Sequence, residues 1–317
     1  MAKTPLRYPG GKSRAVKHIL PLVPSDVTEL CSPFLGGGSV ELAFNQERGG
    51  TVYGYDLFEP LVWFWEALLE SPEKLADAAD AMRVHDENFV MVKKDKDGNV
   101  TSRTKVRGLL KETCEEIRKE LKKAKNSSIE NAAKFYAINR STFSGATFSG
   151  GWSNQAAYSR FTDSSIERVR EFKVKNFHVA CESFQTSILK HPDAFLYCDP
   201  PYLLGTDKDR LYGIGGDMHQ GFPHRELYNI LSERKGWVLS YNDCEDIRKL
   251  YSDYEIRDAE WAYGMKNVDS QVSADRRALE DLMLILKSPE TKEMVQQILD
   301  GLKKKKMGSS SELLIIG

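Results

Sequence analysis

A chain of 317 residues, 41% of them hydrophobic, is long enough to bury one substantial core with an inserted module, or two small domains. No apolar run approaches the roughly 18 residues of a membrane-spanning helix and no signal-peptide pattern is present, so we expect a cytoplasmic protein. The five cysteines are far apart and the six histidines are scattered, which excludes a disulfide framework and predicts no metal site.

Charge is distributed unevenly along the chain. The net charge of −1 argues against a uniformly basic nucleic-acid binder, but residues 93–140 contain 14 Lys and Arg against 7 Asp and Glu. One interpretation is a segment that holds nucleic-acid phosphates, with Lys119, Lys122 and Lys123 as candidates. The other is a solvent-exposed helix face with ion pairs between residues four positions apart.

The first 70 residues alternate between strand-like and helix-like segments. Strands are expected at residues 27–31 and 51–56, with a helix over 39–44 between them and another over 59–69. This strand-helix-strand order predicts an α/β fold with a parallel sheet.

Two glycine motifs lie in this part of the chain. Gly36, Gly37 and Gly38 stand between a strand and a helix, where a nucleotide-binding loop belongs because glycine lets the backbone approach a ligand closely. Asp56 follows Gly36 by 20 positions, at the end of the next strand, and this spacing fits a carboxylate that holds ribose hydroxyls. Glu41 stands where a dinucleotide fingerprint requires a small residue, so a nicotinamide cofactor is the weaker interpretation. A tight turn followed by a surface aspartate is the alternative without a ligand.

The earlier glycine motif, residues 7–13, ends in the Gly-Lys-Ser sequence of a phosphate loop. That loop also requires a glycine where Leu6 stands and a strand ahead of it. Both are missing, which argues against a nucleoside triphosphatase and leaves a glycine turn that contains Lys12.

The amino-acid composition and the hydrophobic pattern change in the middle of the chain. Residues 71–136 have a helical, charged pattern with a turn at 95–99, and residues 141–154 have the Gly, Ser and aromatic content of a hairpin or an adaptable loop. Strand-like segments return at 177–181, 195–198 and 237–241. We therefore expect a discontinuous catalytic domain, residues 1–70 and 177–317, interrupted by an insert over residues 71–176.

Two segments compete for the last strand of the sheet, residues 282–286 and 312–316. We favour the second, because the first lies inside a helical period that continues through residues 295–299. The lysine and serine stretch over 303–311 is typical of a solvated linker into that strand.

The most informative motif is Asp-Pro-Pro-Tyr at residues 199–202, directly after the apolar run 194–198. Two prolines end a strand, because neither donates an N–H and both fix φ, so Asp199 and Tyr202 are held on a stiff turn. The amino group of a base that has left a duplex needs an acceptor for its protons and a ring to stack on, and the motif supplies both. A proline turn after a core strand is the structural alternative.

Taken together, these motifs resemble the Dam-type DNA adenine-N6 methyltransferases in sequence and in order. The matching segments are residues 8–12, residues 33–39, Asp56, residues 199–202 and, more faintly, residues 312–315. The resemblance implies a Rossmann-like, mostly parallel methyltransferase sheet with a helical and hairpin target-recognition insert. It also implies S-adenosyl-L-methionine as the cofactor.

The resemblance also implies the functional residues. It places at the cofactor Tyr8, Lys12, Phe34, Asp56, Phe184 and Asp199, to which the nucleotide-loop pattern adds Gly36 and Gly38. The flipped adenine would be received by Asp199, Pro200 and Tyr202. The candidates for DNA contact, the charged lysines included, are Arg7, Lys119, Lys122, Lys123, Arg140 and Asn154. The chain differs from the family at Ser183, Tyr241 and residues 150–155, so no recognition sequence is predicted.

The predicted function is site-specific methyl transfer from S-adenosyl-L-methionine to N6 of a flipped adenine in duplex DNA, by a monomer from a restriction-modification system or a phage. A sulfonium methyl group is already electrophilic, so the enzyme has to align the amino nitrogen and accept its hydrogen bonds. Asp199 and the Pro200 carbonyl would do so. Three alternatives stay open: a methyltransferase for RNA or another exocyclic amine, a nicotinamide-dependent oxidoreductase, and a non-catalytic DNA-binding module, which would not need the Asp-Pro-Pro-Tyr acceptor.

Overall fold

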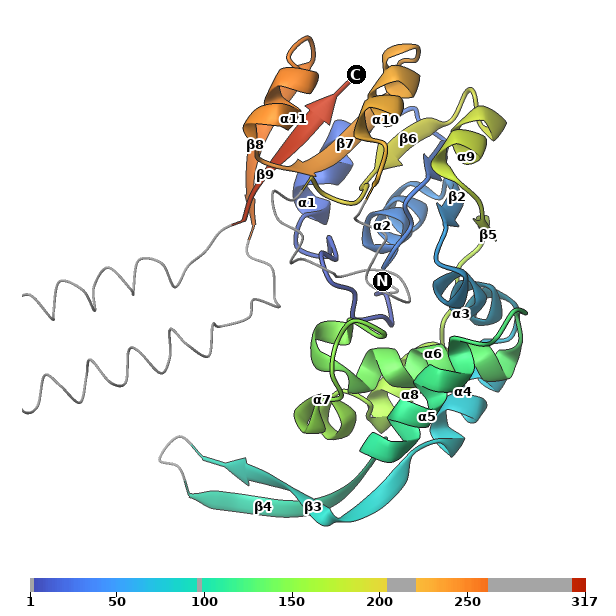
Figure 1. The fold of residues 1–317 in the computed structure, drawn as a ribbon, viewed down its shortest axis with the longest axis vertical. Helices are drawn as coiled ribbons and strands as arrows, with labels where there is room; N and C mark the ends of the chain where they lie inside the picture. The colour runs from blue at the N-terminus through green and yellow to red at the C-terminus, as the bar shows by residue number, and fades with distance from the viewer. Residues whose placement is uncertain (1–2, 96–98, 204–220, 262–309) are drawn as a thin grey trace, which may run out of the picture. The chain divides into compact units, whose positions relative to one another are not determined.

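The computed structural model of the chain describes residues 3–95, 99–203, 221–261 and 310–317 (Figure 1). These residues form a seven-stranded sheet, in the order β5-β2-β1-β6-β7-β9-β8, and a separate two-stranded sheet, β3-β4. The chain divides into two compact units, Met1–Asp258 with Glu312–Gly317, and Ala259–Ser311, and the site described below lies in the first. Within the described ranges, the helices are too short or too polar to cross a membrane.

The large sheet is mostly parallel. Its parallel strands are β1 (Glu29–Ser32), β2 (Thr51–Asp56), β5 (Phe177–Cys181), β6 (Phe195–Cys198) and β7 (Trp237–Asn242). Every residue of β6 and all but the last of β7 are buried, as expected for central strands of a sheet covered on both faces. The fold class and these strand positions predicted from the sequence are confirmed.

Two further strands complete one side of the sheet, β9 (Ser310–Ile316) and, beyond it, β8 (Glu255–Trp261). Strand β9 is antiparallel to β7 and places Glu312 opposite Asn242. This confirms the choice of residues 312–316 as a strand of the sheet, while the competing segment 282–286 lies outside the described residues.

The helices that follow the strands agree with the βαβ pattern. They are α1 (Val16–Ile19), η1 (Leu20–Leu22), α2 (Ser39–Arg48), α3 (Glu59–Glu70), α9 (Phe184–Lys190), α10 (His224–Ser232) and α11 (Glu245–Leu250). Helix α2 runs four residues beyond the predicted end and stops at Gly49, which adopts the left-handed conformation of a helix C-cap. Helix α3 is buried along most of its length, because it packs against both the sheet and the helices of the following segment.

The segment between α3 and β5 is helical except for one hairpin. Its helices are α4 (Pro72–Ala81), α5 (Lys111–Leu121), α6 (Ile129–Ser141), η2 (Phe143–Gly145), α7 (Asn154–Ser159) and α8 (Asp163–Arg170). The glycine-rich stretch over 141–154 is a loop closed by a single antiparallel bridge between Thr142 and Trp152. The division into a catalytic domain and an insert over 71–176 stays a prediction.

The helical pattern predicted for residues 71–136 is wrong over 84–108. Strands β3 (Val84–Lys94) and β4 (Val100–Gly108) pair there as an antiparallel ribbon around the expected turn (Figure 1). The N–H of Asp95 donates to the carbonyl of Asn99 at 2.9 Å, which closes that turn, although residues 96–98 lie outside the description. Val90, Val92 and Val100 are each more than a third exposed, so these apolar residues do not follow the alternation of buried and exposed positions by which strands are recognised.

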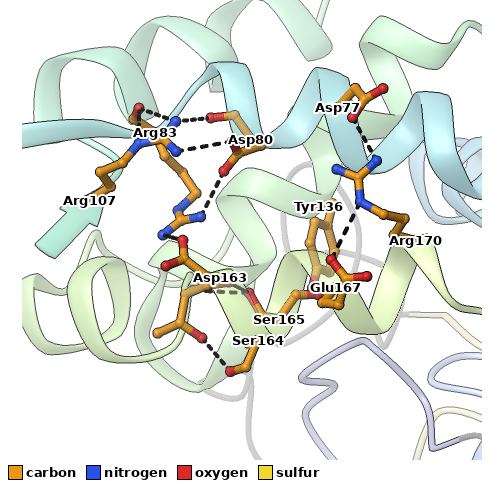
Figure 2. Close-up of polar contacts among 11 residues, drawn as sticks. Asp77, Asp80, Arg83, Arg107, Tyr136, Asp163, Ser164, Ser165, Glu167 and Arg170 are labelled. Carbon is orange, nitrogen blue, oxygen red and sulfur yellow. Dashed lines mark hydrogen bonds and ion pairs between the residues drawn. The ribbon is translucent and has the colours of Figure 1, made fainter.

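A cluster of ion pairs joins the base of the ribbon to two helices (Figure 2). The buried Arg83 guanidinium bonds Asp80 on α4 and Asp163 on α8, each at 2.7 Å. Arg107 on β4 bonds the second oxygen of Asp80 at 3.0 Å and also donates to the Asp80 and Arg83 carbonyls. Asp80 is therefore the carboxylate shared by both arginines.

Replacing Asp80 by alanine should lower the free energy of unfolding by about 1–3 kcal/mol, because Arg83 would keep one partner while most of its side chain stays buried. Asp80 is itself a third exposed, which keeps the cost below that of breaking a fully buried pair. Denaturant unfolding would measure the change. The matched control is Asp77→Ala, which removes an exposed pair with Arg170 and should cost less than about 1 kcal/mol. Equal stability of the two variants would contradict the role given to Asp80.

Candidate active site

The candidate site residues gather where adjacent parallel strands end. The segment from Pro33 to Gly38 follows β1, Asp56 ends β2, and Asp199 follows β6, while β7 lies next to β6. Because these strands are parallel neighbours, their carboxyl ends meet at one edge of the sheet, where open α/β sheets bind ligands.

The Asp199 carboxylate is held from two sides. Its Oδ2 accepts from the Lys12 ammonium at 2.8 Å, and its Oδ1 accepts from the Ser240 hydroxyl on β7 at 2.8 Å. The side chain is 22% exposed, so one part of it stays reachable. The two contacts fix the carboxylate at the carboxyl end of β6.

Lys12 is buried, with 5% of its side chain exposed. Its Nζ donates to the Tyr202 hydroxyl at 2.9 Å and to the Gly10 carbonyl at 3.1 Å, besides Asp199. The glycine turn places it there: Gly10 has a φ of +69°, and the Gly11 N–H donates to the Tyr8 carbonyl. The Gly-Lys-Ser sequence is thus a turn that directs a lysine into the fold.

The Tyr202 ring is fixed by its neighbours. It stacks on Tyr241 of β7 with centroids 6.0 Å apart, and the Lys12 ammonium lies 5.1 Å from its centroid. Tyr241 was noted in the sequence as a departure from the family, and its role as the support of Tyr202 was not foreseen. Burial raises the pKa of the Tyr202 hydroxyl, with the nearby carboxylates of Asp199 and Glu312 adding to the effect, so the hydroxyl stays protonated.

Asp56 and the glycine loop are joined directly. One carboxylate oxygen of Asp56 accepts from the N–H of Gly36 at 3.0 Å and the other from the N–H of Phe58 at 2.9 Å. Burial raises the pKa of Asp56, and the backbone hydrogen bonds oppose that shift. The aspartate therefore orders the loop as well as lining it.

The glycines of the loop make room for aromatic rings. Gly36 has a φ of +47°, and a Cβ there would lie 3.0 Å from the ring of Tyr8. Gly38 has a φ of +64°, and a Cβ there would lie 2.7 Å from Trp65. Gly36 thus faces Tyr8 in the candidate site, whereas Gly38 is required by packing against α3.

Three phenylalanines form a cluster beside this loop. The centroids of Phe34 and Phe184 are 5.7 Å apart, and Phe222 lies 5.6 Å from Phe34 and 5.5 Å from Phe184. Phe222 was missed in the sequence, where it has no motif around it. Ser183, another departure from the family, caps α9 by accepting from the N–H of Thr186.

Arg7 and Arg140 lie where the N-terminal segment meets α6. Asn139 accepts from the Arg7 N–H at 3.0 Å and donates to its carbonyl at 2.7 Å, and the buried Arg140 donates to the carbonyls of Pro5 and Arg160. Burial lowers the pKa of Arg7 to about 10, with Arg140 and Arg160 contributing by charge repulsion. Arg140 thus anchors the N-terminal segment to α6.

The remaining DNA candidates belong to the helical segment and are exposed. Lys119 is on α5, Lys122 and Lys123 follow that helix, and Asn154 is the first residue of α7. The structure does not bring them to the sheet edge that holds Asp199. Across residues 3–95, 99–203, 221–261 and 310–317, His, Cys, Asp and Glu side chains form no group of three suited to a metal ion.

The site as a whole has three chemical capacities. Asp199 can accept hydrogen bonds from an amino group, the ring of Tyr202 can stack on a flat ligand, and the loop with Asp56 can hold a hydroxylated ligand close to the backbone. All three lie on the same edge of one sheet.

Two comparisons with known proteins bear on this site. A family model described as D12 class N6 adenine-specific DNA methyltransferase matches residues 8–265, and this match confirms the resemblance found in the motifs. A search of curated proteins finds no match.

Proposed function

Because the chain belongs to the D12 class N6 adenine-specific DNA methyltransferase family, and is therefore an enzyme that methylates adenine in DNA at specific sites, we propose how its residues divide that work. The methyl donor is S-adenosyl-L-methionine, held at the glycine loop. The target adenine is extruded from duplex DNA and received at the Asp-Pro-Pro-Tyr turn.

The loop and its neighbours fit this donor. Each oxygen of Asp56 accepts one backbone N–H and keeps a further lone pair, so the carboxylate can also accept from two ribose hydroxyls. The absence of a side chain at Gly36 lets the ring of Tyr8, another proposed cofactor contact, lie against the loop. The residues that would hold the donor are Tyr8, Lys12, Phe34, Gly36, Gly38, Asp56, Phe184 and Asp199.

When bound, the donor supplies an electrophilic methyl carbon. The adenine nitrogen would form a bond to that carbon as the carbon–sulfur bond breaks, with the electron pair left on sulfur, and the nitrogen would then lose one proton to water. Asp199 and the Pro200 carbonyl accept hydrogen bonds from the amino group, which directs the nitrogen lone pair toward the methyl carbon. Stacking on Tyr202 offsets part of the few kcal/mol that base flipping costs. The observation that supports this proposal best is the partly exposed Asp199 carboxylate at the end of β6, beside the fixed ring of Tyr202.

The segment over 71–176 would bind the duplex around the target base. Its lysines would contact phosphates, and Arg7 and Asn154 would lie near the bases. Arg140, proposed from the sequence as a further DNA contact, is buried and would act through the N-terminal segment that it anchors. We propose that the enzyme acts as a monomer, in the cytoplasm, where the DNA of a bacterium or of its phage is found.

Transfer of a labelled methyl group tests this function. The purified chain, S-adenosyl-L-methionine carrying the label and duplex DNA should give N6-methyladenine as the labelled nucleoside. Sequencing of DNA from cells that express the chain would then identify the recognition site. Label on cytosine, or transfer to RNA with no transfer to duplex DNA, would contradict the proposal.

Replacing Lys119, Lys122 and Lys123 together by glutamine should weaken binding to all DNA sequences alike. If each lysine neutralises one phosphate, the slope of log K against log salt should flatten by about one unit per lysine. Fluorescence anisotropy over a salt series would measure both effects. The control is Lys249→Gln, an exposed lysine of α11 paired with Glu245. A triple variant that changes the methylated sequence but keeps the salt slope would show that the lysines read bases.

A further inference from the structure

A second buried carboxylate lies beside the catalytic motif. Glu312 on β9 is 1% exposed, and apart from a weak hydrogen bond from the Tyr202 hydroxyl neither of its oxygens accepts one from the described residues. A buried carboxylate with so little hydrogen bonding reduces stability, so its presence at a site calls for a functional reason. The residues that face it are Lys12, Tyr202, Asp199 and Tyr197.

Lys12 lies between this carboxylate and Asp199. Its Nζ is 2.8 Å from Asp199 Oδ2 and 3.8 Å from Glu312 Oε2, so Asp199 has the hydrogen bond and Glu312 interacts by charge alone. The hydrogen bonds from Lys12 and Ser240 leave one lone pair on each oxygen of Asp199, but they make the carboxylate a weaker acceptor for an amino group. The ammonium has to move only about 1 Å toward β9 to exchange one carboxylate for the other.

We propose that Glu312 is a positioning residue for methyl transfer: its carboxylate draws the Lys12 ammonium toward β9 and so frees Asp199 to accept from the adenine amino group. The inference rests on the proposed role of Asp199. With both carboxylates ionised, the trio of Lys12, Asp199 and Glu312 carries a net charge of −1, which also favours the positive charge that moves from sulfur to nitrogen during transfer.

The state of Glu312 depends on pH. Burial raises its pKa to about 7, and the Lys12 ammonium partly opposes the shift. The carboxyl is therefore neutral below this pH, where it no longer attracts Lys12, and charged above it. Because the pKa is raised in the folded protein, ionisation costs stability as pH rises from about 4.5, the ordinary glutamate pKa, to about 7.

Glu312→Gln tests the proposal, because glutamine keeps the shape and removes the charge. At pH 8 the single-turnover rate of methyl transfer should fall on the order of tenfold, less than the 100-fold that a full 1 Å misplacement can cost. From pH 8 to pH 6 the wild-type rate should fall about tenfold, since a group with a pKa near 7 is about one-tenth ionised at pH 6, and the variant should lose that dependence. The dissociation constants for cofactor and DNA should stay within about threefold, and the melting temperature at pH 8 should not fall.

Two further variants complete the experiment. Glu312→Asp restores the charge and should recover part of the rate and the pH dependence. Glu41→Gln removes another buried carboxyl whose pKa burial raises to about 7, but Glu41 bonds Ser32 rather than Lys12, so the pH dependence should survive.

The proposal is overturned if Glu312→Gln keeps the wild-type rate and pH profile, if it loses stability and cofactor binding together with activity, or if Glu41→Gln alone abolishes the pH dependence. Asp199→Ala, measured in parallel, distinguishes failure of the role proposed for Asp199 from failure of the role proposed for Glu312. A normal transfer rate for that variant would reject the role of Asp199. If Asp199→Ala is inactive but Glu312→Gln keeps the wild-type rate, only the role of Glu312 is rejected.

Discussion

Replacing Asp199 by alanine should leave a folded protein that still binds duplex DNA but transfers methyl groups about 100- to 1,000-fold more slowly. The hydrogen bond from the adenine amino group to Asp199 strengthens as the nitrogen commits its lone pair to the methyl carbon, so its loss affects the transition state more than the bound substrate. The fold should tolerate the change, because Lys12 keeps Glu312 as a counter-charge 3.8 Å away. A buried lysine left without any anion would be far more costly.

The measurement is single-turnover transfer of labelled methyl to duplex DNA with saturating cofactor, followed by nucleoside analysis. Asp243→Ala is the matched control, because Asp243 follows β7 and pairs with the partly exposed Arg248. That variant should keep the wild-type rate. A near-normal rate for Asp199→Ala would remove this carboxylate from the chemistry.

The parallel core of the fold follows from local sequence. Strand β6 is a continuous apolar run, β7 is mostly apolar, and α2 and α3 lie between glycine or proline signals that fix their ends. Both strands are almost entirely buried, so their composition marks them, and the helices are marked by their end signals. The family match over residues 8–265 then confirms the class of enzyme that their motifs predicted.

The β3-β4 ribbon could not be recognised in the same way. Its strands mix charged, polar and valine residues, and Val90, Val92 and Val100 are exposed, so the hydrophobic period that separates strand from helix is absent. What fixes its base is tertiary, namely the pairing of Arg107 with Asp80. Such a contact between distant residues leaves no periodic signal.

The candidate site was predicted as a set of motifs but not as a network. Lys12 and Tyr202 are 190 positions apart, and their hydrogen bond exists only because β6 ends beside the N-terminal glycine turn. Glu312 and Tyr241 come from β9 and β7, where the sequence predicts strands but does not indicate which side chains contact Lys12 or Tyr202. Sequence motifs identify groups that meet a ligand, whereas the residues that hold those groups depend on the register of neighbouring strands. The assignment of individual site residues to cofactor and DNA stays a proposal.

Replacing Asp56 by alanine should weaken S-adenosyl-L-methionine binding roughly 10- to 100-fold, the equivalent of losing about 1.5–3 kcal/mol from hydrogen bonds to a charged acceptor. Two causes contribute. The carboxylate would accept from the ribose hydroxyls, and it also holds the N–H groups of Gly36 and Phe58, so the variant loosens the loop as well. Calorimetric titration of the wild type and the variant would measure the sum of both.

A cofactor analogue without ribose hydroxyls separates the two causes. If Asp56 holds the hydroxyls, the wild-type protein should bind the analogue much more weakly than S-adenosyl-L-methionine, while Asp56→Ala should bind both alike, because the group that would sense the difference is gone. If Asp56 only orders the loop, removal of the hydroxyls should cost the same affinity in both proteins. Unchanged affinity of Asp56→Ala for S-adenosyl-L-methionine itself would place the cofactor elsewhere than on the edge of β2.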